Sequence, residues 1–98
     1  MEYSALIKSQ PVVLVEFYAS WCPHCQRMMP VVADVKKRVS GAFALAQYDV
    51  DEYPDLAEAN RVDSMPTFII YKDGEEAWRR EGEMPEMALL KAIQKFSK

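Results

Sequence analysis

Two cysteines separated by two residues carry the clearest chemistry in the sequence. They lie in the segment Trp21-Cys22-Pro23-His24-Cys25, and the 98-residue chain has 2 cysteines in all. If Cys22 caps a helix and Cys25 lies one turn further on, their Cα atoms are about 5–6 Å apart, inside the range that a disulfide needs. The pair could therefore form and break a disulfide with little backbone movement.

The expected place of Cys22 at a helix N-terminus favours its ionised form. Unpaired backbone N–H groups and the positive end of the helix stabilise an anion there, so the pKa of the Cys22 thiol should be lowered. We expect Cys25 to be more buried and less acidic. One attacking and one resolving sulfur is the arrangement that thiol–disulfide exchange requires.

Cys-x-x-Cys pairs also occur in metal sites. Zinc needs a second pair of Cys or His ligands, which this chain lacks outside the segment, so no metal is expected in a single chain. Haem attachment would need His directly after the second Cys, where Gln26 stands. These points favour redox chemistry. A metal or iron–sulfur module formed by a dimer is the alternative, and the intact cysteine pair argues against a passive interaction domain.

Composition limits the remaining classes of function. The length predicts a single domain, residues 1–98, and 2 cysteines are too few for a disulfide-rich scaffold. With 12 basic and 15 acidic residues, the net charge of −3 gives no reason to expect a nucleic-acid partner. The apolar run from Pro11 to Val15 ends at Glu16, far short of the roughly 20 residues of a membrane span. No signal-peptide pattern is visible, so a cytoplasmic location is the default expectation, although a processed mature chain would look the same.

The elements that position the cysteines alternate between helix and strand. Val12–Tyr18 is apolar on both parities, as in a strand covered on both faces, and Asp73-Gly74 is typical of a hairpin turn. Alternation followed by a hairpin indicates an α/β layer fold. In order, the sequence predicts a short helix within Glu2–Lys8, strand Val12–Tyr18, helix Pro23–Val39 interrupted by Pro30, strand Ala42–Val50, helix Tyr53–Asn60, strands Thr67–Tyr71 and Glu76–Arg80, and a helix opening at Pro85 with Met87, Leu90, Ile93 and Phe96 on one side.

Several segments together resemble the thioredoxin family from about Pro11 to the C-terminus. The resemblance implies a thioredoxin-like fold, with a central mixed sheet flanked by helices on both faces. It also implies a protein disulfide oxidoreductase, with Cys22 as the nucleophile and Cys25 as the resolving thiol. The matching features are Val15-Glu16-Phe17-Tyr18-Ala19 before Trp21-Cys22-x-x-Cys25, Pro30 five residues after Cys25, Met65-Pro66-Thr67, Lys72-Asp73-Gly74-Glu75, and Gly82.

The same resemblance implies how substrates dock. Pro66 should be cis and face the cysteines, which leaves the Met65 backbone able to pair with an extended substrate segment. Trp21 and Gly82 should complete the docking surface. The resemblance further implies protein disulfide substrates, no cofactor beyond the redox-active cysteine pair, and regeneration by a flavin-containing, NADPH-dependent thioredoxin reductase.

Glu16 is one departure from the family pattern, because the family usually has Asp beneath the second cysteine. A carboxylate inside an apolar strand is costly to bury, so we expect a raised pKa and a proton-relay role for Cys25. The family's lysine partner aligns with Gln47, which removes a cation that would help to ionise the acid.

The Pro23-His24 pair is another departure and resembles the DsbA-type disulfide oxidants, where thioredoxins usually have Gly-Pro. An imidazole beside Cys22 could donate a hydrogen bond or a positive charge to the thiolate, which stabilises the reduced form and raises the reduction potential. The sequence thus leaves open a more oxidising, DsbA-like or isomerase-like function.

The N-terminus is also shorter than in the family. Few residues precede the Val12 strand, so the first edge strand should be missing and the sheet should have four strands. In the family's strand order, the Ala42–Val50 strand then becomes an exposed edge. Gln47 and Asp49 could blunt this edge, or it could support pairing, so we expect a monomer or a weak dimer.

Overall fold

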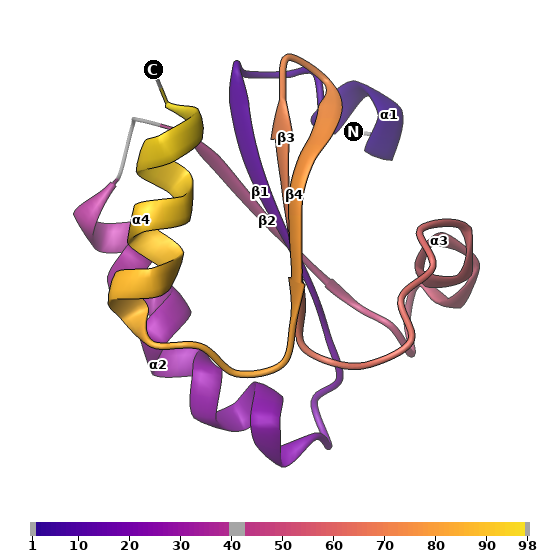
Figure 1. Ribbon diagram of the computed structural model, residues 1–98. Coiled ribbons are helices and arrows are strands. Elements are labelled where there is room, and N and C mark those ends of the chain that lie inside the picture. Colours follow the sequence, from indigo (N-terminus) through magenta and orange to yellow (C-terminus); the bar gives the residue numbers. More distant parts are fainter. Residues whose placement is uncertain (1, 40–42, 98) are drawn as a thin grey trace.

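Alternating helices and strands, in the predicted order, make up the computed structural model, which describes residues 2–39 and 43–97 (Figure 1). The predicted start of the second strand, Ala42, lies outside the described residues. The elements are α1 (Tyr3–Leu6), β1 (Val12–Tyr18), α2 (Pro23–Arg38), β2 (Ala44–Asp49), α3 (Pro54–Ala59), β3 (Thr67–Lys72), β4 (Glu75–Glu81) and α4 (Glu86–Phe96).

The described strands form one mixed sheet of four strands in the order β2-β1-β3-β4. Strand β1 runs parallel to β2 and antiparallel to β3, and β3 and β4 form the predicted hairpin. At the hairpin turn Asp73 and Gly74 have φ angles of 53° and 86°, the region that Gly and Asp tolerate best. The expected four-stranded sheet, with β2 at one edge, is confirmed.

Helices cover both faces of the sheet, with α2 and α4 on one face and α1 and α3 on the other (Figure 1). The period of two along β1 explains this. Val12 and Leu14 pack into a hydrophobic core with α2 and α4, whereas Val13, Val15 and Phe17 pack on the other face with residues of α1 and α3. Because both faces are covered, β1 is apolar on both parities.

Helix α4 corrects one sequence-based expectation. Its buried residues are Leu89, Leu90 and Ile93, whereas Met87 is 61% exposed. Met87 lies about 200° around the helix axis from Leu89, on the solvent side of the buried stripe. The prediction that Met87 shares one side of the helix with Leu90 and Ile93 was therefore wrong as to the buried side.

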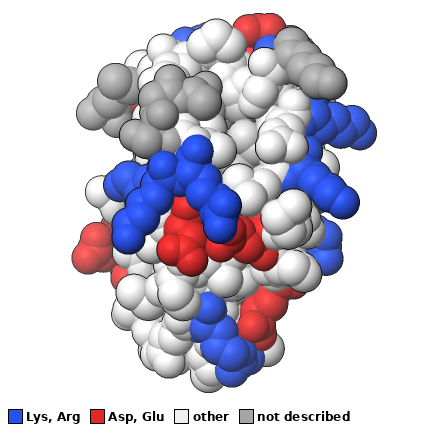
Figure 2. Space-filling view, turned by 90° about the vertical axis from the view of Figure 1, so that its left-hand side faces the viewer, with Lys and Arg blue, Asp and Glu red and all other residues white. Residues whose placement is uncertain are grey.

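The outer face formed by α2 and α4 carries charges of both signs. Arg38 near the end of α2 forms an ion pair of 2.7 Å with Glu86 at the start of α4. Figure 2 shows this face, on which basic and acidic side chains lie beside one another, so that no large patch of one charge sign forms there. None of the described helices combines the length and apolar content that a membrane crossing requires.

Candidate active site

The turn between β1 and α2 places both cysteines in the first turn of a helix. Cys22 is the N-cap of α2, its backbone N–H donates to the Ala19 carbonyl at 3.1 Å, and its own carbonyl accepts from Gln26 at 3.0 Å. Pro23 occupies the first helical position, where its missing N–H costs no hydrogen bond. The predicted placement of Cys22 at the cap and Cys25 within the first turn is confirmed.

The two thiols are free, so the structure shows the dithiol form, and their environments differ. Backbone N–H groups, first that of Cys25, lower the pKa of the Cys22 thiol, and the charge of Arg27 acts in the same direction. Burial raises the pKa of Cys25, which is 2% exposed, to about 11. The predicted contrast between an acidic first thiol and a buried second thiol is confirmed.

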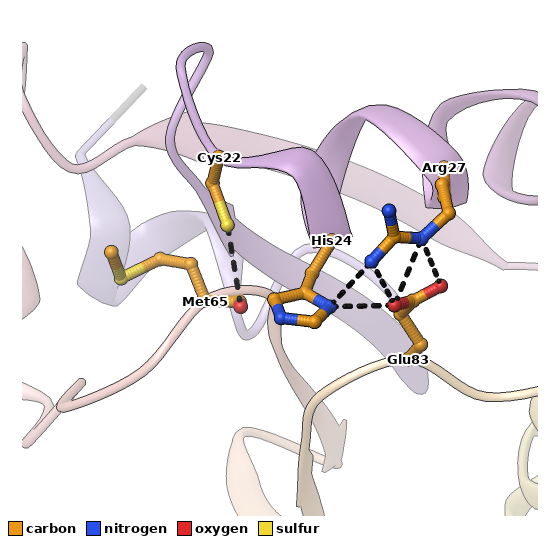
Figure 3. Close-up of polar contacts among 5 residues, drawn as sticks. All are labelled: Cys22, His24, Arg27, Met65 and Glu83. Carbon is orange, nitrogen blue, oxygen red and sulfur yellow. Dashed lines mark hydrogen bonds and ion pairs between the residues drawn. The ribbon is translucent and has the colours of Figure 1, made fainter.

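The segment before β3 brings a backbone acceptor to the first thiol. The Met65–Pro66 peptide bond is cis, as predicted, and the Met65 carbonyl oxygen lies 3.8 Å from the Cys22 sulfur (Figure 3). The Gly82 N–H donates to the Pro66 carbonyl at 2.8 Å, which ties the end of β4 to this segment. Cys22, Met65, Pro66 and Gly82 therefore meet at one end of the sheet.

Trp21 lies on the surface beside the cysteines, where a docking role would require it. The side chain is 62% exposed, and its Nε1–H donates to Asp51 Oδ2 at 2.8 Å. Sequence reasoning did not single out Asp51. Its place two residues after the end of β2, at the same end of the sheet as the turn after β1, is the signal that could have identified it, because parallel neighbouring strands end at the same edge.

Glu16 is buried in the middle of β1, with 3% of its surface exposed. Gln47, its register partner on β2, donates from Nε2 to Glu16 Oε1 at 2.8 Å. Burial raises the pKa of Glu16, and the Gln47 hydrogen bond opposes the rise without cancelling it. The predicted direction is confirmed. The carboxylate is also close enough to Cys25 that its charge adds to the raised pKa of that thiol.

The Nδ1 edge of the His24 ring faces Glu83, a partner that sequence reasoning missed. Its Nδ1 lies 2.6 Å from Glu83 Oε2, and the Arg27 Nη2 lies 2.9 Å from the same nitrogen (Figure 3). The backbone N–H of His24, rather than its imidazole, helps to lower the pKa of Cys22. The expected contact between the imidazole and the thiolate is therefore replaced by contacts with a carboxylate and a guanidinium.

Gln47 and Asp49, expected to blunt the β2 edge, have partners within the chain. Gln47 donates to Glu16, and Asp49 Oδ1 accepts from the Asp51 backbone N–H at 2.9 Å. Within residues 2–39 and 43–97, no three His, Cys, Asp or Glu side chains are grouped so that they could hold a metal ion.

Comparison with known proteins gives consistent matches. The family model described as Thioredoxin matches residues 1–95. The chain is 36% identical over 89 residues, 91% of its length, to thioredoxin Y, chloroplastic, of Oryza sativa, of which it covers 53%. It is 34% identical over 91 residues to a thioredoxin-like protein of Synechocystis, with 93% of the chain and 87% of that protein covered.

Solved structures agree with the sequence matches. A mutant thioredoxin from Halobacterium salinarum superposes with a TM-score of 0.89 at 35% identity, covering 99% of this chain and 84% of that one. The chain spans about half the length of the rice relative, 53%.

Proposed function

The chain belongs to the thioredoxin family, and on that premise we propose that it exchanges a dithiol for a disulfide with protein substrates through Cys22 and Cys25. Members of this family are thiol–disulfide oxidoreductases. The observation that carries the proposal is the pair of free thiols in one helical turn, with a lowered pKa at Cys22 and a raised pKa at Cys25.

In the first step, the Cys22 thiolate attacks one sulfur of a substrate disulfide. The S–S bond of the substrate breaks, its other sulfur leaves as a thiolate and takes up a proton, and Cys22 is left in a mixed disulfide. Cys25 then loses its proton and attacks the Cys22 sulfur. The substrate leaves as a dithiol, and the protein keeps a Cys22–Cys25 disulfide.

Glu16 is the group we propose to take the proton from Cys25. A thiol with a pKa of about 11 needs a base before it can attack, and Glu16 is buried on the same side of the sheet. Its raised pKa brings the carboxylate closer to neutral pH, where a general base transfers protons best.

Substrate docking is assigned to the surface around Cys22. An extended segment of the substrate would pair with the Met65 backbone, beside Pro66, and contact Trp21 and Gly82. The exposure of Trp21 and the nearness of the Met65 carbonyl to the Cys22 sulfur support this placement.

We propose protein disulfides as substrates and a flavin-containing, NADPH-dependent thioredoxin reductase as the partner that restores the dithiol. The cysteine pair itself carries the electrons, so the proposal needs no further cofactor. A monomer or weak dimer in the cytoplasm belongs to the same proposal, and sedimentation and cell fractionation would test these two points.

We assign the reducing direction to the exchange. An oxidant or isomerase would be favoured by an imidazole that stabilises the Cys22 thiolate. The His24 Nδ1 instead contacts Glu83 and Arg27, which supports the reducing direction. A redox titration against glutathione tests the direction, because an oxidant of the DsbA type would keep its dithiol at a much higher glutathione disulfide fraction.

The central experiment measures reduction of insulin disulfides with the wild-type protein and two serine variants. We expect Cys22→Ser to abolish activity and Cys25→Ser to accumulate a covalent mixed disulfide with the substrate. Met29→Leu is the matched control, since this exposed residue of α2 lies outside the proposed site. Bound zinc, or a visible absorption band together with no exchange activity, would instead indicate the dimeric metal or iron–sulfur module.

A further inference from the structure

Glu83 joins the loop after β4 to the first turns of α2. Its carboxylate accepts from Arg27 through Nε at 3.0 and 3.1 Å and through Nη2 at 2.8 Å, so the guanidinium binds it as a fork. The His24 Nδ1 lies 2.6 Å from the same carboxylate. One acid therefore binds the two side chains of α2 that could bring positive charge to the active site.

Both of these side chains lie close to the reactive sulfur in sequence. His24 is two residues after Cys22, and Arg27 is one turn beyond His24 on the same helix. The charge of Arg27 already lowers the pKa of the Cys22 thiol. Any group that offsets the charge of Arg27, or that binds the His24 ring nitrogen, must weaken the stabilisation that these side chains can give the thiolate.

We propose that Glu83 is a positioning residue that holds His24 and Arg27 away from the Cys22 sulfur and thereby keeps the reduction potential of the Cys22–Cys25 pair low. This inference rests on the proposed thiol–disulfide exchange. It explains how a Pro-His active site can remain a reductant. The sequence feature that favours an oxidant is offset by a carboxylate from a distant loop.

The geometry in Figure 3 supports the assignment. The Cys22 sulfur is directed at the Met65 carbonyl, whereas the Nδ1 side of the His24 ring and the guanidinium of Arg27 are directed at Glu83. Hydrogen bonds with Arg27 and His24 also lower the pKa of Glu83 to about 2, so the carboxylate stays ionised at neutral pH.

The test is an equilibrium with glutathione. Two glutathione thiols give up two electrons and two protons and become glutathione disulfide, while the Cys22–Cys25 bond breaks and both cysteines become thiols. Stabilising the Cys22 thiolate favours the dithiol and raises the equilibrium constant of this reduction.

We expect Glu83→Gln to raise that constant roughly threefold to tenfold, where tenfold corresponds to about 30 mV for a two-electron couple. The pKa of Cys22, followed by thiolate absorbance in the ultraviolet, should fall in parallel. Glu86→Gln is the matched control, because it removes a carboxylate paired with an arginine, at Arg38, and makes the same change in net charge. This control should leave both quantities unchanged.

A second comparison separates positioning from direct repulsion between Glu83 and the thiolate. In a protein that already carries His24→Ala and Arg27→Gln, adding Glu83→Gln should change the equilibrium constant little. If the full effect persists there, or if Glu83→Gln equals wild type in the glutathione titration, the inference is wrong while the exchange activity stands. If the wild-type protein does not exchange with glutathione or insulin, the proposed function itself fails.

Discussion

The two faces of the sheet bury polar groups in different ways. On the α1 and α3 face, the Tyr3 hydroxyl donates to the Tyr71 hydroxyl at 2.5 Å, and Tyr71 donates to Asn60 Oδ1 at 3.4 Å. The Asn60 carbonyl in turn accepts from Arg79 at 2.9 Å. On the α2 and α4 face, Glu16 is buried with a hydrogen bond from Gln47.

The difference shows what each region is built to do. Burial raises the pKa of both tyrosines above an already high value, so these hydroxyls stay neutral at any physiological pH and link α1, β3 and the end of α3. Burial also raises the pKa of Glu16, but a carboxyl group starts near 4.5 and is moved toward neutrality. Burial therefore keeps the tyrosine hydroxyls of the α1 and α3 face neutral, whereas on the α2 and α4 face it brings a carboxyl group closer to the pH at which it can exchange a proton.

The largest expected effect is on the rate of mixed-disulfide resolution, which should depend on Glu16 and not on Tyr71. Glu16→Gln removes the proposed proton acceptor, so resolution of the mixed disulfide by Cys25 should slow by about a hundredfold at neutral pH. Stopped-flow tryptophan fluorescence during substrate reduction measures this rate. Tyr71→Phe is the control and should leave it unchanged. Equal rates for Glu16→Gln and wild type across pH would exclude the proton-relay role.

The free energy of unfolding should instead depend on the tyrosine pair of the α1 and α3 face. Tyr71→Phe leaves the Tyr3 hydroxyl without its buried partner, so the free energy of unfolding should fall by about 1–2 kcal/mol. Urea unfolding measures the change. Tyr53→Phe makes the same chemical change at a residue that is 46% exposed, and it should cost less than about 0.5 kcal/mol. A similar loss in both variants would show that the hydroxyl network does not stabilise the fold.

The pH dependence of stability should also distinguish the two regions. Because folding raises the pKa of Glu16, the wild-type protein should lose stability relative to Glu16→Gln as the pH rises from about 4.5 through the folded pKa. The slope should not exceed about 1.4 kcal/mol per pH unit. The tyrosines, whose pKa values are also raised, should produce such a loss only above about pH 10. Urea midpoints across pH provide the measurement, and parallel wild-type and Glu16→Gln curves would contradict the raised pKa.

The smallest expected effect comes from the partner of Glu16. Gln47→Lys places a cation at the position of the present amide donor, so the pKa of Glu16 should fall and the pH profile of resolution should shift toward acid, with less than a tenfold change in rate at neutral pH. Gln47→Leu removes the hydrogen bond and should shift the profile the other way. Shifts of the same sign in both variants would show that the residue acts on packing rather than on charge.

Much of this arrangement could be predicted from local sequence. The alternating and helical periods predicted the element order, and the α2 core residues Met28, Val32 and Val35 recur at helical spacing. The error at Met87 also has a local cause. An apolar residue near a helix end fits the spacing of more than one helix face, and only the packing of the helix decides which face is buried. The raised pKa of Glu16 followed from a single acid inside an apolar strand.

The partners of the site residues could not be predicted in the same way. His24 and Glu83 are 59 residues apart, and no periodicity relates them. Gln47 was expected opposite Glu16 only through the family pattern, since the pairing depends on the register of β1 against β2. Asp51 lies in a turn and Glu83 in a loop, and in neither place does the local sequence indicate which distant side chain will be contacted.

The sequence by itself determined that two thiols of unequal acidity would lie in the first turn of a helix and that an acid would lie inside an apolar strand. Turn residues, side-chain period and helix ends act between near neighbours, so they can be deduced without coordinates. Only the tertiary structure decided which partners the charged side chains near the thiols have. Long-range contacts depend on how the strands and loops are packed together, and this packing placed Glu83 against the His24 Nδ1.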